Sequence, residues 1–376
     1  MERLIKLIIV CLILAGVWNL YGDHLKNGNY QAAYIDAKTD IISIKENPTV
    51  ISTFERLQNG LSTLIDKLDQ KMDPDSKFES KSVEKPDLSS PTTQSFSVYN
   101  IEIGDSKEKV EKQVGKAKRA SINEYGVKWH TYHTDYQNFF MAAYNDAGKV
   151  AGLYTNQDLI TSKSGITLNS SKNEALKLLG EPLTSMRKGI VTYQMQDTQE
   201  STLFKLDDNY ITIFYDKHEN DRVTAIQIIS AELEKQKKTF YPEPNDELKE
   251  GFEYQLFDLT NAARVTHGLN FLTWNEVVKD TARKHSADMA KNNYFNHTNL
   301  RGESPFDRMK ADNIRFSTAG ENLATGQLSS IFAHEGLMNS LGHRENILQK
   351  DFRELGVGVD FSSDKRPYYT ENFVTK

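Results

Sequence analysis

The stretch "STAGENLATG", Ser317–Gly326, carries a single charged side chain, Glu321, among glycines, alanines and hydroxyl residues. Small residues on both sides of a carboxylate are typical of close backbone approach and tight packing, not of a loose surface loop. The stretch contains no lysine or arginine to pair with Glu321. A carboxylate in such surroundings titrates, binds a ligand or caps backbone N–H groups, and the rest of the chain has to decide among these roles.

Apolar residues at helical spacing flank this stretch on both sides. Toward the C-terminus the pattern changes to the alternation of β-strands. Apolar spacing predicts four helices, over residues 248–269, 274–299, 304–313 and 329–341. The segment "RELGVGVDFSS" (353–363) alternates apolar with small or polar residues, which predicts a half-buried strand, and "RPYYTENFV" (366–374) predicts a second strand. Helices on a small sheet indicate an α+β domain over residues 246–376.

An internal repeat precedes this domain. The segments "IEIGDSKEKVEKQVG" (101–115) and "ITLNSSKNEALKLLG" (166–180) align without gaps. Each indicates a short strand, a turn and a helix that ends at glycine, and Ser171 and Glu174 predict a capping box in the second copy. Strand pairs with turn signals follow each copy. The repeat therefore predicts a duplicated α+β domain over residues 97–238.

The N-terminus carries an export signal. Arg3 and Lys6 precede an unbroken apolar run from Leu7 to Trp18, and no small-x-small cleavage site follows it. We expect residues 1–22 to be an uncleaved membrane anchor with the rest of the chain outside the cell. The alternative is a cleaved signal peptide and a secreted protein. Cys11 is the only cysteine, so the chain forms no intramolecular disulfide.

Residues 23–96 are predicted to be a stem helix and a polar linker. The apolar stripe over residues 50–68 indicates an amphipathic helix that packs on a domain or dimerises, and residues 73–94 have the composition of a flexible linker. At 376 residues the chain is long enough for two domains. Its 46 basic and 52 acidic residues give no basic excess, which argues against a nucleic-acid partner.

Several polar residues have plain structural interpretations. His285 lies on an apolar stripe and is expected to be a core histidine bonded to a backbone carbonyl, whereas His334 is expected to be solvated. His343 could simply begin a short helix, and Glu321 could accept backbone N–H groups. The segment "AHEGL" (333–337) lacks the second histidine of a HExxH zinc peptidase, and no serine lies in a nucleophile elbow.

Taken together and in order, seven motifs resemble the CAP superfamily, the group of cysteine-rich secretory proteins, antigen 5 and pathogenesis-related 1 proteins, in its bacterial form. The motifs are "HSADM" (285–289), "FNHT" (295–298), "SPFDRM" (304–309), "GENLATG" (320–326), "NSLGHRENIL" (339–348), "LGVGV" (355–359) and "YYTENF" (368–373). The duplicated region resembles the CAP-associated N-terminal domain. The resemblance implies an α-β-α sandwich with a large cleft, so that the chain is an α+β protein of two domains behind a membrane segment.

The resemblance also implies which residues line the cleft. The family usually carries two histidines and two glutamates there, and in some members the histidines bind zinc. The matching histidines are His297 and His343, the tentative metal ligands, and the first glutamate is Glu321. The second glutamate position falls at Ser340 or Asn339, with Glu335 a turn or more away. The expected cleft set is His297, Glu321, Asn322, Ser340 and His343.

We therefore expect a membrane-anchored protein that binds a lipid, a peptide or a wall-derived ligand in this cleft. Zinc binding should be weak, because only two imidazoles and one carboxylate converge and no second carboxylate orients the imidazoles. One alternative is a metal-dependent hydrolase with Glu321 as general base. Another is a non-catalytic envelope scaffold.

Overall fold

The computed structural model describes residues 83–188, 191–194 and 199–376. The predicted membrane anchor (1–22) and the predicted dimerising helix (50–68) lie outside these residues. Within the described part of the chain, no helix combines the length and the apolar character that crossing a bilayer requires.

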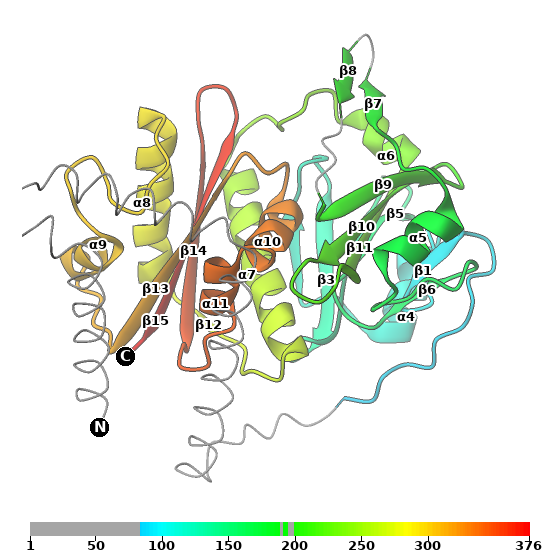
Figure 1. Ribbon diagram of the computed structural model, residues 1–376, viewed down its shortest axis with the longest axis horizontal. Coiled ribbons are helices and arrows are strands. Elements are labelled where there is room, and N and C mark those ends of the chain that lie inside the picture. The colour runs from blue at the N-terminus through cyan, green and yellow to red at the C-terminus, as the bar shows by residue number, and fades with distance from the viewer. Residues whose placement is uncertain (1–82, 189–190, 195–198) are drawn as a thin grey trace, which may run out of the picture. The chain divides into compact units, whose positions relative to one another are not determined.

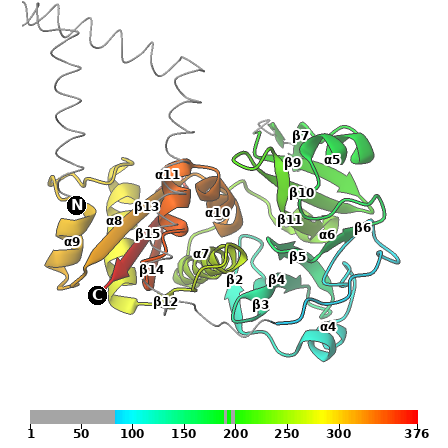
Figure 2. The ribbon, with the colours of Figure 1, turned by 60° about the horizontal axis from the view of Figure 1, so that its bottom comes forward.

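The first domain contains a seven-stranded antiparallel sheet in the order β2-β3-β4-β5-β11-β10-β9 (Figures 1 and 2). Its strands are β2 (Arg119–Ile122), β3 (Lys128–Thr134), β4 (Gln137–Tyr144), β5 (Val150–Thr155), β9 (Ser201–Leu206), β10 (Asn209–Asp216) and β11 (Arg222–Ser230). Two short pairs accompany it: β1 (Phe96–Val98) with β6 (Ile160–Ser162), and β7 (Ser185–Lys188) with β8 (Val191–Gln194). Helix α6 (Ala231–Gln236) follows β11.

Each half of this domain contains a short strand, a helix and a set of antiparallel strands, in that order. Helices α4 (Lys107–Val114) and α5 (Lys172–Leu179) each begin after a serine cap, and an antiparallel meander follows each of them. The capping box predicted for Ser171 and Glu174 is confirmed. Isolated bridges join Ser106 to Lys149 in the first half and Ser171 to Arg222 in the second. The last strands of the halves, β5 and β11, pair with each other.

The second domain contains a four-stranded sheet in the order β12-β14-β15-β13 between two layers of helices, an α-β-α arrangement (Figure 1). Helices α8 and α9 lie on one face, and α7, α10 and α11 lie on the other. The strands are β12 (Thr273–Trp274), β13 (Thr318–Thr325), β14 (Glu354–Phe361) and β15 (Pro367–Thr375), and the helices are α7 (Asp246–Thr266), α8 (Glu276–Asn292), α9 (Pro305–Ala311), α10 (Ser330–Met338) and α11 (Leu341–Ile347). The stretch "STAGENLATG" thus contains strand β13, which the sequence reading did not assign.

Strand β14 is buried on both faces, not on one. On one face, Leu355, Val357 and Val359 pack in the core against α7. Its other face holds Gly356 and Gly358, where an added Cβ would lie 2.1 Å from the Lys279 nitrogen and 1.9 Å from the Arg283 nitrogen. The backbone of α8 therefore rests directly on the strand. The prediction of a half-buried strand was wrong because the glycines face a helix instead of solvent.

Helix α7 belongs to both cores, because it contacts β14 on one side and β2 and β4 of the first domain on the other. Polar contacts between the domains surround α10. The Tyr154 hydroxyl donates a 2.5 Å hydrogen bond to Glu335, and both side chains are buried. His334, expected to be solvated, is only 1% exposed, and burial lowers its pKa to about 3. Tyr154 of the first domain therefore covers Glu335, a charged position that the sequence of α10 alone would place in solvent.

The contact between β14 and α8 predicts a large effect for Gly358→Ala. The added methyl group has to displace helix backbone, so we expect the free energy of unfolding to fall by about 3 kcal/mol in urea titrations. Gly336→Ala is the matched control, because the space beside that helical glycine is open. Removing a helical glycine should raise stability by about 0.5–1 kcal/mol. Equal effects of the two substitutions would contradict the close contact.

Burial at the domain junction predicts a pH dependence that is specific to Glu335. Desolvation raises the pKa of Glu335 from 4.5 to about 7. The folded state therefore holds its proton more tightly, and this contribution to stability is lost as pH rises from 4.5 through about 7. Glu335→Gln should remove up to about 3 kcal/mol of this pH dependence in urea unfolding across that window. The exposed Glu232→Gln control should leave the profile unchanged; a profile that is the same in the wild type and in Glu335→Gln would contradict the assignment.

Candidate functional site

Glu321 lies in β13, and both of its carboxylate oxygens are engaged. Oε1 accepts a 2.9 Å hydrogen bond from His297 Nδ1, and Oε2 accepts a 2.6 Å bond from Arg308 Nη2. The Glu321 side chain is 1% exposed, whereas that of His297 is 50% exposed. The cation that the stretch itself lacks is supplied by α9. Glu321 is therefore charge-paired and joined to a histidine, and it does not serve as a backbone cap.

Arg308 is held in place by the start of its helix. Ser304 caps α9 in a capping box with Asp307, and a proline occupies the first turn. Arg308 Nη1 donates to the backbone carbonyls of His297, at 2.7 Å, and Glu303, at 3.0 Å. The same guanidinium thus fixes the carboxylate and the loop that carries His297.

Asn322, the next residue of β13, points to the opposite face of the sheet, as neighbouring strand residues do. Its amide donates to the His343 carbonyl and to Glu371 Oε2, both at 3.1 Å. Glu371 Oε1 accepts a 2.7 Å bond from the Thr260 hydroxyl. Burial raises the pKa of Glu371 to about 7, although these two hydrogen bonds oppose the shift.

His343 lies in the first turn of α11, where Ser340 is the N-cap residue. Its Nδ1 is 2.8 Å from Ser340 Oγ. Burial lowers the pKa of His343, and the His297 ring lowers it further, so the two imidazoles are electrostatic neighbours. The structure thus connects His297 to Glu321 directly, and it connects His343 to both Ser340 and Asn322.

Among the residues that the structure describes, no group of three or more His, Cys, Asp or Glu side chains is arranged to bind a metal ion. Glu335 and Asn339, the residues considered near the second glutamate position, face the first domain. Glu335 accepts from Tyr154, and the Asn339 amide bonds to the backbone of Tyr215 and Lys217. These residues therefore supply no second carboxylate to the site.

His285 has the structural role expected of it. Its Nε2 lies 3.0 Å from the Asn296 carbonyl, and burial lowers its pKa. Arg308 and Glu371 are the polar residues of this region that the sequence reading missed. The signal for each was available, since Arg308 belongs to the motif "SPFDRM", and Glu371 is a lone acid in an otherwise strand-like segment.

Comparisons with known proteins match both domains. The family described as cysteine-rich secretory protein, or CAP, matches residues 257–373, and the CAP-associated N-terminal family matches residues 103–240. The uncharacterized membrane protein YlbC of Bacillus subtilis is 29% identical over 73% of this chain and 82% of its own length. The uncharacterized protein YkwD of the same organism is 41% identical over 33% of this chain and 48% of its own length.

Two solved structures have the same fold over most of the chain. An extracellular protein from Bacillus anthracis with an SCP domain is 28% identical, with a TM-score of 0.64 over 78% of this chain and 100% of that one. A cysteine-rich secretory protein from Staphylococcus aureus is 16% identical, with a TM-score of 0.55 over 73% of this chain and 94% of that one. With the α-β-α sandwich, the two family matches lead to one conclusion: the chain is a CAP-domain protein, with a CAP-associated N-terminal domain before its CAP domain.

Proposed function

We propose that this CAP protein is a membrane-anchored, extracellular binding module whose site around His297, Glu321 and His343 takes a ligand and binds zinc weakly. A basic and apolar N-terminal segment supports the location. Two relatives agree with this location, since one is described as a membrane protein of B. subtilis and the other as an extracellular protein of B. anthracis. The ligand classes we propose are lipid, peptide and wall-derived fragment. The matching halves of the first domain support its origin by duplication.

The pairing of Glu321 is the observation that favours binding over hydrolysis. A general base has to come within hydrogen-bond reach of the water or substrate proton that it takes. The Glu321 side chain is only 1% exposed, and its two oxygens already accept from His297 and from Arg308 in a buried ion pair. The geometry therefore supports a role for Glu321 in orienting His297.

Orientation matters because it decides which imidazole nitrogen can bind a ligand. A carboxylate only accepts hydrogen bonds, so His297 Nδ1 carries the proton and Nε2 keeps its lone pair at neutral charge. This carboxylate–histidine arrangement is the one that supports metal ligands in proteins. His343 Nδ1 lies 2.8 Å from Ser340 Oγ, and Nε2 has its lone pair available in the tautomer in which Nδ1 donates to that hydroxyl. Two imidazoles fit a zinc ion only as a weak site, and zinc bound there would polarise an oxygen of the ligand.

Zinc binding is the direct test of this pairing. Calorimetric titration of the metal-stripped full-length protein with zinc should show one site. Its binding free energy should be smaller than the roughly 10 kcal/mol typical of structural zinc sites. His297→Ala/His343→Ala should abolish it, because both proposed ligands are removed. His130→Ala/His267→Ala is the matched control, since these histidines contact Lys107 and the Ala263 carbonyl outside the site. Equal binding by the two double variants would refute the metal role.

Glu321→Gln separates an orienting role from a catalytic one. The substitution leaves the buried Arg308 cation without its counter-charge, so the free energy of unfolding should fall by about 3 kcal/mol. Glu303→Gln, which loosens the exposed pair with Arg301, should cost much less. Weakened zinc binding in Glu321→Gln is also expected. Peptidase or esterase activity that disappears in a folded Glu321→Gln protein would instead favour the hydrolase.

A further inference from the structure

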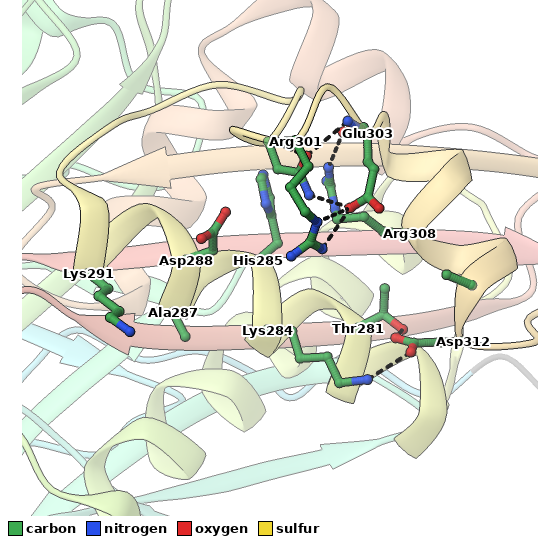
Figure 3. A pocket seen from close by; sticks show the side chains of 12 residues that line it. Thr281, Lys284, His285, Ala287, Asp288, Lys291, Arg301, Glu303, Arg308 and Asp312 are labelled. Carbon is green, nitrogen blue, oxygen red and sulfur yellow. Dashed lines mark hydrogen bonds and ion pairs between the residues drawn. The ribbon is translucent and has the colours of Figure 1, made fainter.

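The pocket between α8 and α9 has charged walls, but most of these charges are paired with one another. Lys284 pairs with Asp312 at 2.8 Å, and Arg301 pairs with Glu303 at 2.7 Å (Figure 3). This pocket therefore indicates no ligand of its own.

A smaller pocket, the junction pocket, lies where the two domains meet. Its floor is one face of β9, β10 and β11, where Leu203 and Gln227 both lie opposite Thr212. Helix α6 of the first domain and Phe332 of α10 contribute to its walls. Phe332 also packs on Phe214 of β10, with their ring centroids 5.2 Å apart. The junction pocket is therefore continuous with the interface between the domains.

The duplication identifies the position that corresponds to Gln227 in the first half. Isolated bridges join the start of each helix to Lys149 in the first half and to Arg222 in the second. Tyr154 and Gln227 each lie five residues beyond these bridged residues. The two side chains therefore occupy equivalent positions on β5 and β11, the last strands of the two halves.

The equivalent positions have different surroundings. Helix α7 packs on the first half, where Tyr154 is fully buried and donates to Glu335 of α10. Gln227 is 3% exposed, yet neither end of its side-chain amide has a hydrogen bond to another described residue. A buried amide without hydrogen bonds is costly. The second half thus presents an unsatisfied amide at the position where the first half contacts the CAP domain.

The size of the junction pocket limits the group that can enter it. Its volume is about 70 Å³, far below the roughly 300 Å³ of sites that enclose a whole small molecule. A cavity that holds a benzene ring has about 150 Å³, so an aromatic ring is too large as well. A branched aliphatic group of about three carbon atoms is the largest apolar group that fits.

The charged side chains in the lining are engaged within the protein. The Tyr125 hydroxyl donates to Glu234 at 2.8 Å, and Lys237 Nζ lies over the ring of the same tyrosine, 5.5 Å from its centre. Most other lining side chains are apolar or aromatic, such as Met186 and Leu203. A neutral occupant is therefore favoured, because a charged group would lose its hydration without gaining a partner.

Gln227 sets the polar part of the occupant. Its amide has an acceptor oxygen and a donor nitrogen, and a half-turn about the last side-chain bond presents either end to the pocket. The hydroxyl of Thr212, directly opposite, has no hydrogen bond to another described residue. A peptide amide, which also has one acceptor and one donor, complements these groups. An amide beside a branched group of three carbons is the chemistry of a valine residue.

We propose that the junction pocket binds the side chain of a valine residue in a partner peptide, and that Gln227 pairs with the adjoining peptide amide. The partner contacts both domains, since Gln227 belongs to the first and Phe332 to the second. The site is separate from the one around His297 and does not depend on zinc.

Titration of the metal-free full-length protein with N-acetyl-L-valinamide, followed by saturation-transfer NMR, tests the site. Valinamide should bind saturably and about tenfold more tightly than N-acetylglycinamide, which lacks the side chain. N-acetyl-L-phenylalaninamide should bind no more tightly than the glycine compound, because its ring exceeds the pocket. Octanoate, an apolar chain without an amide, should bind more weakly than valinamide.

Gln227→Leu removes the amide and keeps a side chain of similar size. The substitution should weaken valinamide binding by about fivefold, because the hydrogen bonds to the peptide amide are lost. The unliganded variant should melt no lower than the wild type, since the amide that it lacks makes no hydrogen bond there. Gln236→Leu is the matched control, because Gln236 is exposed on α6 and lies outside the lining. It should leave the affinity unchanged.

The proposal is overturned if valinamide shows no saturable binding, or if the glycine compound, the phenylalanine compound or octanoate binds as tightly. Equal responses of Gln227→Leu and Gln236→Leu would also overturn it. The ligand series needs no variant, so a folding defect in either one would not decide the result. Because no metal is present, failure here leaves the zinc test unaffected.

Discussion

The direct contact between the backbone of α8 and the glycine face of β14 is the constraint on which the CAP domain depends. Without side chains at Gly356 and Gly358, the helix approaches the sheet more closely than any Cβ would permit. This position places His285 beneath the start of the following loop, where it holds the Asn296 carbonyl. His297 lies one residue further along. A packing requirement of two glycines thus helps to set the location of His297.

The ion pair between Glu321 and Arg308 is the second feature that holds the site together. Burying Glu321 alone would be costly, and the cost is offset by Arg308 on the neighbouring helix. Arg308 also donates to the backbone carbonyls of His297 and Glu303. One guanidinium therefore neutralises Glu321 and holds the loop that carries His297. The opposite face of β13 uses neutral partners instead, with Asn322 joining Glu371 to the His343 carbonyl. Consecutive residues of one strand therefore support the two histidines from different sides.

Much of this architecture could be predicted because it is encoded locally. The capping box at Ser171 and the helices of the CAP domain follow from patterns of a few neighbouring residues. The seven ordered motifs indicated the family. Strand β13 was missed because its glycines and alanines lack strand periodicity, and because its burial depends on β15 beside it. Arg308 was missed as the partner of Glu321 because 13 residues separate them in the chain. The burial of Glu335 could not be predicted from α10, since Tyr154 of the neighbouring domain contacts it.

The attachment of Asn339 to the first domain has a consequence for how the protein responds to force. Its side-chain oxygen, its side-chain nitrogen and its carbonyl all bond to residues 215–218, and Arg344 in α11 pairs with Asp216 at 2.7 Å. Ser340 and His343 lie between these two attachments in the chain. The end of β10 is therefore bonded to the chain on both sides of His343, so a displacement of the first domain would shift the segment that carries this histidine.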